Sequence, residues 1–283
     1  MKKIIACIGS GNMGSALMRG IARAIDGADI GFADADIEKA KSAAEFGARV
    51  YASNEEAAEK GDYIFLAVKP QVLGSVLAEI APVVRERYSE GNAPVLVSMA
   101  AGWSIQKIAA RVSWVPFVSL PRVATQIARI MPNTPALISK GITTLAFSPE
   151  VPAEKRAELE AMLGGTGTVD VVSEHLLEAA TGVSGCGPAF AYMFIEALAD
   201  GGVLAGLPRD KALIHAASTV LGSAAMVLET GKHPGELKDM VCSPGGATIA
   251  GVAALENGAF RSAVIKAVGA SGRRALKLGS ADM

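Results

Sequence analysis

The sequence has few cysteines, few histidines and no excess of charge. Its three cysteines, Cys7, Cys186 and Cys242, are far apart and odd in number, which argues against a disulfide framework and for a reducing, cytoplasmic compartment. The three histidines show no ligand spacing such as His-Glu-x-x-His, so we expect no metal site. A formal net charge of -1, without blocks of like charge, gives no electrostatic footprint for nucleic acid or an anionic membrane. We therefore expect a small-molecule partner.

Two apolar runs resemble a targeting or membrane-spanning segment, but neither has the features of one. The run at its start ends at Gly9 and is too short for the apolar part of a signal peptide, so we expect a buried first strand. The stretch from Pro188 to Leu204 is almost long enough to cross a bilayer, but Glu196 and Asp200 lie inside it. We expect a core helix there and no membrane partner.

The composition is that of a globular protein, because hydrophobic residues make up 51% of the 283 residues. This length favours two domains. Up to residue 172, short apolar runs alternate with helical spacing, which predicts an α/β domain with a Rossmann-like, doubly wound parallel sheet. The expected strands span residues 3–8, 29–33, 49–51, 62–68, 94–99 and 168–172.

After Val172 the strand pattern stops, and residues 173–283 are expected to form an all-α domain. Ser173 is placed to cap its first helix, while Gly206 and Gly231 are placed to close the next two. Helices this apolar exceed what one small domain can cover, so we predict that this domain is the dimerisation surface. The expected helices span residues 173–180, 188–205, 208–230, 248–256 and 260–278.

Gly9, Gly11 and Gly14 have the spacing Gly-x-Gly-x-x-Gly between an expected strand and an expected helix. This spacing allows a tight turn and close approach of the backbone to a pyrophosphate, while the helix start offers free amides to the phosphates. Asp34 would accept hydrogen bonds from the adenosine ribose and oppose a 2′-phosphate, which favours NADH, but it fits a helix N-cap equally well. Asn54 could serve a 2′-phosphate from another loop, so NADPH stays open.

The sequence lacks the usual proton donors of two dehydrogenase classes. None of the four tyrosines has a lysine four places on, which excludes a short-chain dehydrogenase. A β-hydroxyacid dehydrogenase would have Gly-x-Gly-x-x-x-Lys at the start of its helical domain, but Ala191 stands where the lysine would follow Gly185 and Gly187. An imine nitrogen can carry its proton before hydride arrives, so a site without a strong acid favours reduction of C=N over C=O.

A second Gly-rich turn, Ser243-Pro-Gly-Gly-Ala247, leads directly into an expected helix that begins near Thr248. Free amides at that helix start would receive a carboxylate, and the Thr248 hydroxyl could accept a hydrogen bond from a ring N–H. The same residues also fit a plain turn between helices with a threonine near the cap.

The order of these motifs resembles the pyrroline-5-carboxylate reductase family across nearly the whole chain. The motifs are Ile8-Gly-Ser-Gly-Asn-Met13, Ala67-Val-Lys-Pro70, Ala100-Ala-Gly102, Met131-Pro-Asn-Thr-Pro135, Gly182-Val-Ser-Gly-Cys-Gly-Pro188 and His233-Pro-Gly-Glu-Leu-Lys-Asp-Met-Val-Cys-Ser-Pro-Gly-Gly-Ala-Thr248. The resemblance implies NAD(P)H-dependent reduction of 1-pyrroline-5-carboxylate to L-proline, the last step of proline biosynthesis, by hydride transfer to C5 of the cyclic imine. It also implies a homodimer intertwined through the C-terminal helices, and dimers of this family assemble further into decamers.

The resemblance assigns residues to two sites. Those implied to bind NADPH or NADH are Ile8, Gly9, Ser10, Gly11, Asn12, Met13, Asp34, Asn54, Ala67, Val68, Lys69, Pro70, Met99, Ala100 and Ala101. Those implied to contact the cyclic imino acid substrate are Glu174, Ser243, Gly245, Gly246, Ala247 and Thr248, with Thr248 as the catalytic residue.

Two features depart from the family pattern. Segment 113–126 looks longer than the family's usual link, which leaves its geometry open, and Met240 stands where some relatives carry Asn. Two other interpretations remain. The chain could reduce another cyclic imino acid, such as a piperideine carboxylate, because one ring methylene changes pocket fit only modestly. It could also be a non-catalytic dinucleotide-binding protein, although the intact turn before Thr248 speaks against that.

Overall fold

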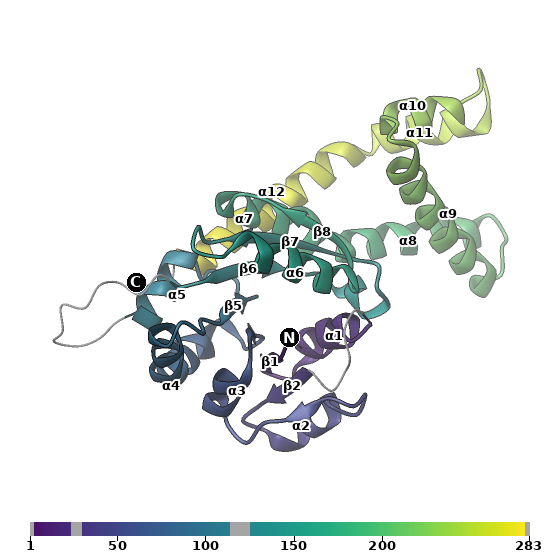
Figure 1. Ribbon diagram of the computed structural model, residues 1–283. Helices are drawn as coiled ribbons and strands as arrows, with labels where there is room; N and C mark the ends of the chain where they lie inside the picture. Colours follow the sequence, from purple (N-terminus) through teal and green to yellow (C-terminus); the bar gives the residue numbers. More distant parts are fainter. Residues whose placement is uncertain (1–2, 24–29, 114–124, 281–283) are drawn as a thin grey trace. The chain divides into compact units, whose positions relative to one another are not determined.

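The computed structural model describes residues 3–23, 30–113 and 125–280, apart from the side chains of 278–280 (Figure 1). The chain packs into two compact units. Cys186–Ala270 form one, and the residues before Cys186 together with those after Ala270 form the other.

The first unit is built on an eight-stranded sheet with the strand order β3-β2-β1-β4-β5-β6-β7-β8. All neighbouring strands are parallel except β6 and β7, which pair antiparallel. The strands are β1 (Ile5–Ile8), β2 (Ile30–Ala33), β3 (Arg49–Val50), β4 (Tyr63–Leu66), β5 (Val95–Ser98), β6 (Ile127–Met131), β7 (Gly141–Phe147) and β8 (Gly167–Val171).

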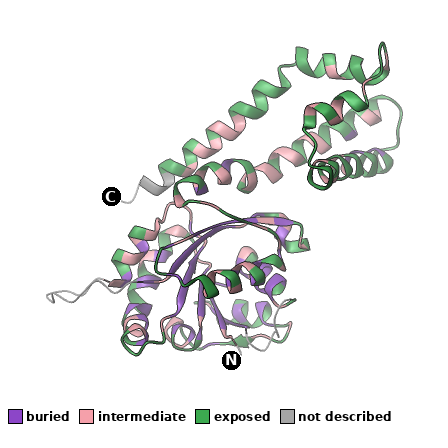
Figure 2. Cartoon of the chain, turned by 45° about the horizontal axis from the view of Figure 1, so that its top comes forward, coloured by how far each residue is buried: buried purple, intermediate pink, exposed green. Residues whose placement is uncertain are grey.

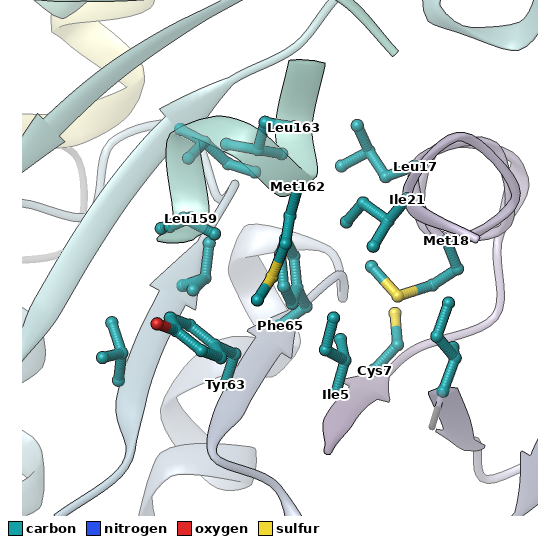
Figure 3. Packing of buried hydrophobic residues seen from close by; sticks show 14 of the residues in the cluster. Ile5, Cys7, Leu17, Met18, Ile21, Tyr63, Phe65, Leu159, Met162 and Leu163 are labelled. Atoms are coloured by element: carbon teal, nitrogen blue, oxygen red, sulfur yellow. The ribbon is translucent and has the colours of Figure 1, made fainter. Parts of the chain in front are cut away.

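Helices cover both faces of this sheet, because its central strands are apolar on both sides. One face packs against α1 (Asn12–Ile21), α2 (Ile37–Ala43) and α6 (Ala153–Gly164), and the other against α3 (Asn54–Lys60), α4 (Pro70–Ser89) and α5 (Ile105–Ser113). Figure 3 shows side chains of β1 and β4, among them Cys7 and Phe65, directed toward Leu17 of α1 and Met162 of α6. The predicted Rossmann-like domain is confirmed.

The sheet differs from the prediction in two strands. The sequence predicted neither β6 nor β7, and it predicted a purely parallel sheet, whereas β7 and β8 run opposite to the others. Arg129 interrupts the apolar run of β6, and Thr143 and Thr144 interrupt that of β7, so neither matched a strand pattern. Most of segment 113–126, residues 114–124, lies outside the described residues.

From residue 174 onward the described chain is helical, as predicted. It forms a 3₁₀ turn at Glu174–Leu176, helix α7 (Leu177–Ala180) and a π-helical turn at Thr181–Gly185. Ser173 stands at the N-cap position, but its side chain makes no capping hydrogen bond, which corrects the expected role. The remaining helices are α8 (Gly187–Leu204), α9 (Arg209–Thr230), α10 (Pro234–Met240), α11 (Ala247–Asn257) and α12 (Phe260–Ser280).

Two glycines end helices as predicted, because each adopts the left-handed conformation that glycine allows without strain. Gly206 follows α8 with φ 100°, and Gly231 follows α9 with φ 64°. The predicted ends of α8 and α9 are therefore confirmed.

The helices of the second unit bury little within a single chain. Of the described residues of this unit, only Ala199, Ala212 and Ala216 are buried, whereas the sheet of the first unit is buried throughout its centre (Figure 2). The helix expected to be buried at 188–204 is therefore mostly unburied within one chain. Among the described helices, α9 is long and apolar enough to cross a membrane by length and composition, and 11% of its most apolar window is buried.

The predicted domain boundary near Val172 stays a prediction. Residues 174–185 pack with the first unit, although they are already helical. The last strand ends at Val171, whereas the first unit continues to Gly185, so the change in secondary structure precedes the change in packing.

Candidate functional site

The carboxyl ends of four neighbouring parallel strands gather the residues predicted to bind a dinucleotide. Ile8 ends β1, Asp34 follows β2, Ala67 follows β4 and Met99 follows β5. Backbone hydrogen bonds join these ends, since the Gly9 amide donates to the Ala33 carbonyl over 2.8 Å and the Ala67 amide to the Ile8 carbonyl over 2.8 Å. The order in which strands are added to the sheet also switches here, because β2 and β3 lie on one side of β1 and β4 lies on the other. Ligands of such sheets bind at this switch point.

Each glycine of the motif has its own structural reason. Gly9 has φ 102°, and a Cβ there would lie 2.6 Å from the Ala67 carbonyl oxygen. A Cβ at Gly14 would lie 2.6 Å from the Gly9 carbonyl oxygen, so a side chain there would push α1 away from β1. A Cβ at Gly11 would meet nothing within 4 Å. Gly9 and Gly14 therefore serve packing, while Gly11 faces open space.

The open space at Gly11 adjoins the start of α1. Gly11 is the N-cap residue of this helix, no side chain caps its first turn, and that turn contains no acidic residue. The first amides of a helix lack partners within it and carry the positive end of its dipole. Since Gly11, Asn12 and Met13 present these amides without a competing side chain, the turn fits the pyrophosphate of a dinucleotide.

Asp34 is held in place as an acceptor. Its Oδ2 accepts hydrogen bonds from the Ser10 amide and the Ser10 hydroxyl, both over 2.7 Å, and its Oδ1 accepts from the Asp36 amide over 3.0 Å. Partial burial acts to raise the pKa of Asp34, but these hydrogen bonds outweigh it and hold the pKa of this carboxyl below its usual value. The helix N-cap is Asp36, which accepts from the amides of Glu38 and Lys39. The alternative role of Asp34 as that cap is thus wrong.

Asn54 lies at the start of α3, where the side chain of Ser53 supplies the cap. Its Nδ2 donates to the Glu79 carboxylate over 2.8 Å. The predicted segment from Ala67 to Pro70 leads into α4, with Lys69 as the uncapped N-cap residue. Trp103, which the sequence did not single out, donates from Nε1 to the Pro70 carbonyl oxygen over 3.0 Å and ties this segment to the one after β5.

The Gly-rich turn before Thr248 forms the start of α11 in the second unit. Gly245 has φ 67°, and Gly246 is the N-cap residue, with its amide donating to the Ser243 carbonyl over 3.0 Å. A Cβ at Gly246 would lie 2.3 Å from the Ser243 hydroxyl, so a side chain there would require Ser243 to change its rotamer. No side chain caps α11, and the residues of the turn are largely exposed, which leaves the helix start open to an anion.

Thr248 is the second residue of α11, after the N-cap. Among the described residues, none forms a hydrogen bond with its hydroxyl, and the capping position is taken by Gly246. Met240, the departure noted in the sequence, is the last residue of α10 and is 64% exposed. The geometry favours a Thr248 hydroxyl that is available to a ligand over one that caps the helix.

Glu174 belongs to the first unit. Its Oε1 accepts from the Ile105 amide over 2.7 Å and from Nη1 of the buried Arg129 over 2.9 Å. Asn133, just after β6, is likewise buried and bonded to the segment that follows Glu174. Sequence reasoning named neither Arg129 nor Asn133 as functional, although a charged residue in the middle of an apolar run was a visible signal. Among the described residues, no group of three or more His, Cys, Asp or Glu side chains is placed to hold a metal.

A Rossmann-type sheet with an open dinucleotide turn, followed by a helical unit, defines a nicotinamide-dinucleotide-dependent oxidoreductase. Two family models match the chain in the same order. Residues 4–102 match the NADP oxidoreductase, coenzyme F420-dependent, family, and residues 174–278 match the pyrroline-5-carboxylate reductase dimerisation family. The second match indicates that the chain oligomerises.

Similar proteins narrow the class to one family. The pyrroline-5-carboxylate reductase of Escherichia coli is 40% identical over 95% of this chain and 95% of its own length, and that of Synechocystis sp. is 47% identical over 82% and 80%. The crystal structure of Plasmodium falciparum pyrroline carboxylate reductase with NADP bound superposes with a TM-score of 0.84 at 31% identity, covering 98% of both chains. The chain belongs to the pyrroline-5-carboxylate reductase family, which confirms the resemblance and the enzyme class.

Proposed function

We propose that this chain reduces 1-pyrroline-5-carboxylate to L-proline with NAD(P)H, the final step of proline biosynthesis. The observation that carries this proposal is the pair of uncapped helix starts, one at Gly11 and one at Gly246, in a chain of this family. The first suits the pyrophosphate of a dinucleotide and the second suits the carboxylate of a small substrate. A protein that only sensed a dinucleotide would have no use for the second.

The dinucleotide side of the proposal uses the strand ends. The turn from Ile8 to Met13 would hold the pyrophosphate on the amides of α1, and Asp34 would accept from the adenosine ribose. Asn54 and the segments 67–70 and 99–101 complete the predicted set. NAD(P)H, when bound, supplies the hydride that C5 of the imine receives. An anionic Asp34 opposes a 2′-phosphate, so it favours NADH, whereas NADP is bound in the Plasmodium falciparum relative.

The substrate side uses the start of α11. The amides from Ser243 to Ala247 would bind the substrate carboxylate, and the Thr248 hydroxyl would accept from the ring N–H of the protonated imine. This contact would orient the C=N bond and keep the proton on nitrogen, so hydride transfer would not require a strongly acidic side chain in the site. Glu174 would contact the substrate through its Oε2, because its Oε1 already accepts hydrogen bonds from Arg129 and from the Ile105 amide.

The proposal includes the assembly and location of the protein. The exposed apolar helices of the second unit would pair with those of a second copy to form a homodimer, and dimers would assemble further into decamers. We place the protein in the cytoplasm, without nucleic-acid or membrane partners, and α9 in the subunit contact. Light scattering tests the assembly, since a monomer at micromolar concentration would contradict it.

The test of activity is oxidation of NADH and of NADPH by the purified protein with a panel of cyclic imines. We expect the highest kcat/KM with 1-pyrroline-5-carboxylate and proline as the product. A preference for the six-membered piperideine carboxylate would replace the substrate but keep the reaction. Binding of NAD(P)H without turnover of any imine would instead support a non-catalytic role and refute the proposal. One ring methylene is worth about 1–3 kcal/mol, so the two substrates should differ by roughly tenfold or more.

A further inference from the structure

Two of the family motifs, residues 131–135 and 182–188, have no role in the sites described above. The structure brings them together. Asn133 lies two residues after the end of β6, and Ser184 lies in the π-helical turn at Thr181–Gly185, directly before the second unit begins. The two residues are 51 positions apart in the chain and are joined by a side-chain hydrogen bond.

Asn133 uses both ends of its carboxamide. Its Nδ2 donates to the Ser184 carbonyl oxygen over 3.0 Å, and its Oδ1 accepts from the Ile142 amide over 2.9 Å. The residue is only 8% exposed, so water does not replace these bonds easily. An aspartate has the same shape and keeps the acceptor, but it cannot donate to Ser184.

The π-helical turn at Thr181–Gly185 is shaped to offer that carbonyl. The Thr181 hydroxyl donates to the Leu177 carbonyl over 2.7 Å, and the Ser184 hydroxyl donates to the Ala180 carbonyl over 2.9 Å. Hydroxyls that bond back to carbonyls one turn earlier compete with the regular helical bonds and widen the turn. The residue after this turn, Cys186, is the first of the second unit.

Arg129 holds the other end of the same segment. It is 2% exposed and forms ion pairs with Glu174 over 2.9 Å and with Glu178 over 3.1 Å. Glu174 also accepts from the Ile105 amide, at the start of the helix that follows the segment after β5. Leu177 packs between these elements in one apolar cluster with Met131 and Ala101. Segment 174–185 is thus bonded to β6 and packed against a predicted dinucleotide-binding residue.

We propose that Arg129 and Asn133, here called the β6 clamp, are positioning residues for the reaction. They fix segment 174–185 against the dinucleotide-binding edge of the sheet. They thereby hold Glu174, a residue of the proposed substrate contact, in a fixed position within the first unit. The inference rests on the proposed function, because it matters only if Glu174 contacts the substrate.

The test compares Asn133→Asp with Thr143→Val in the full-length protein. Thr143 is fully buried in β7, its hydroxyl has no hydrogen-bond partner among the described residues, and it touches neither site, so Thr143→Val is a matched change outside the clamp. For Asn133→Asp we expect kcat/KM for the imine to fall by roughly tenfold to a hundredfold, because small misplacements of reacting groups cost that much. The dissociation constant of NADPH, measured by fluorescence without substrate, should stay within about twofold of wild type, since no coenzyme contact is changed. Thr143→Val should keep both values.

Hydrogen exchange provides a readout that does not depend on activity. The amides of residues 182–187 should exchange faster in Asn133→Asp than in wild type and unchanged in Thr143→Val. Glu178→Gln, which keeps an acceptor for Arg129 but removes a charge, should show a smaller effect in the same direction. If wild type turns over no imine, the proposed function fails while exchange still decides whether the clamp exists. Wild-type kinetics in Asn133→Asp, unchanged exchange, or an NADPH affinity that falls as much as kcat/KM would each overturn the clamp.

Discussion

A substitution at Gly11 should impair dinucleotide binding without impairing folding, because the space that a side chain would occupy there is open and no packing contact fills it. Its backbone, at φ -67° and ψ 176°, is extended and is open to any residue. A Cβ there would meet nothing within 4 Å, whereas one at Gly14 would lie 2.6 Å from the Gly9 carbonyl oxygen. Gly11→Val should therefore keep the fold, and Gly14→Ala should damage it.

The expected magnitudes follow from these two environments. At Gly11, a side chain that fits the native backbone stabilises by about 0.4–1 kcal/mol through the unfolded state. At Gly14, overpacking costs about 1–3 kcal/mol, which lowers the Tm by roughly 2–4 °C per kcal/mol. A valine at position 11 would displace the pyrophosphate from the amides of α1, and each lost charge-assisted hydrogen bond costs about 1.5–3 kcal/mol. Coenzyme affinity should fall by at least about tenfold.

The assay combines thermal unfolding with titration of NADH and NADPH, followed by fluorescence, on wild type and both variants. We expect Gly11→Val to unfold at or above the wild-type temperature and to bind either coenzyme poorly. Gly14→Ala should unfold earlier. Unaltered coenzyme affinity in a folded Gly11→Val protein would refute the placement of the pyrophosphate, and with it the account of the α1 amides.

The remaining predictions concern Thr248, Asp34 and Cys7. Thr248→Ala should lower kcat/KM by about one to two powers of ten and Thr248→Ser should retain most activity, whereas an Ala variant that is less stable but kinetically normal would show that the hydroxyl is structural. Asp34→Ser should shift the ratio of kcat/KM values toward NADPH, and a wild type that already strongly prefers NADPH would contradict this role of Asp34. Because the pKa of Asp34 is lowered on folding, its stabilising effect is present above the ordinary carboxyl pKa and is lost as pH falls through the folded value, so the Tm values of wild type and Asp34→Asn should approach one another as the pH is lowered beyond the ordinary carboxyl pKa. Burial raises the pKa of the Cys7 thiol, so iodoacetamide should label Cys7 only after unfolding, and rapid labelling of the native protein would show that β1 is not buried as described.

The strands that bind the dinucleotide were predictable because each one carries its own signal. The runs ending at Ile8, Ala33, Leu66 and Ser98 are short, apolar and followed by small or turn-forming residues. Both faces of these strands are buried, so local sequence and tertiary environment agree. The glycine motif was recognisable because its spacing is local, although the close contact at Gly9 is with Ala67 of a neighbouring strand end.

The antiparallel part of the sheet was not predictable in the same way. The direction of β7 is a property of its pairing with β6, and the sequence of neither strand encodes it locally. The choice between a ribose contact and a helix N-cap for Asp34 also required the folded structure, which shows that Asp36 is the cap.

Contacts between residues that are distant in the sequence limited how much of the site could be predicted. Arg129 reaches Glu174 across 45 positions, and Asn133 reaches Ser184 across 51. A sequence alone presents these residues as parts of separate motifs. Thr248 was found only because its turn has a local signature, and the availability of its hydroxyl became clear once Gly246 was seen to be the capping residue.

The sparse burial in the helices of the second unit determines which defective chains can assemble with normal ones. Because only three alanines there are buried within one chain, these helices depend on neighbouring subunits, and the stability of the folded chain depends on subunit concentration. A chain with a damaged dinucleotide turn but intact helices would still enter assemblies with normal chains. A variant that cannot form these helices would instead be left out of the assemblies.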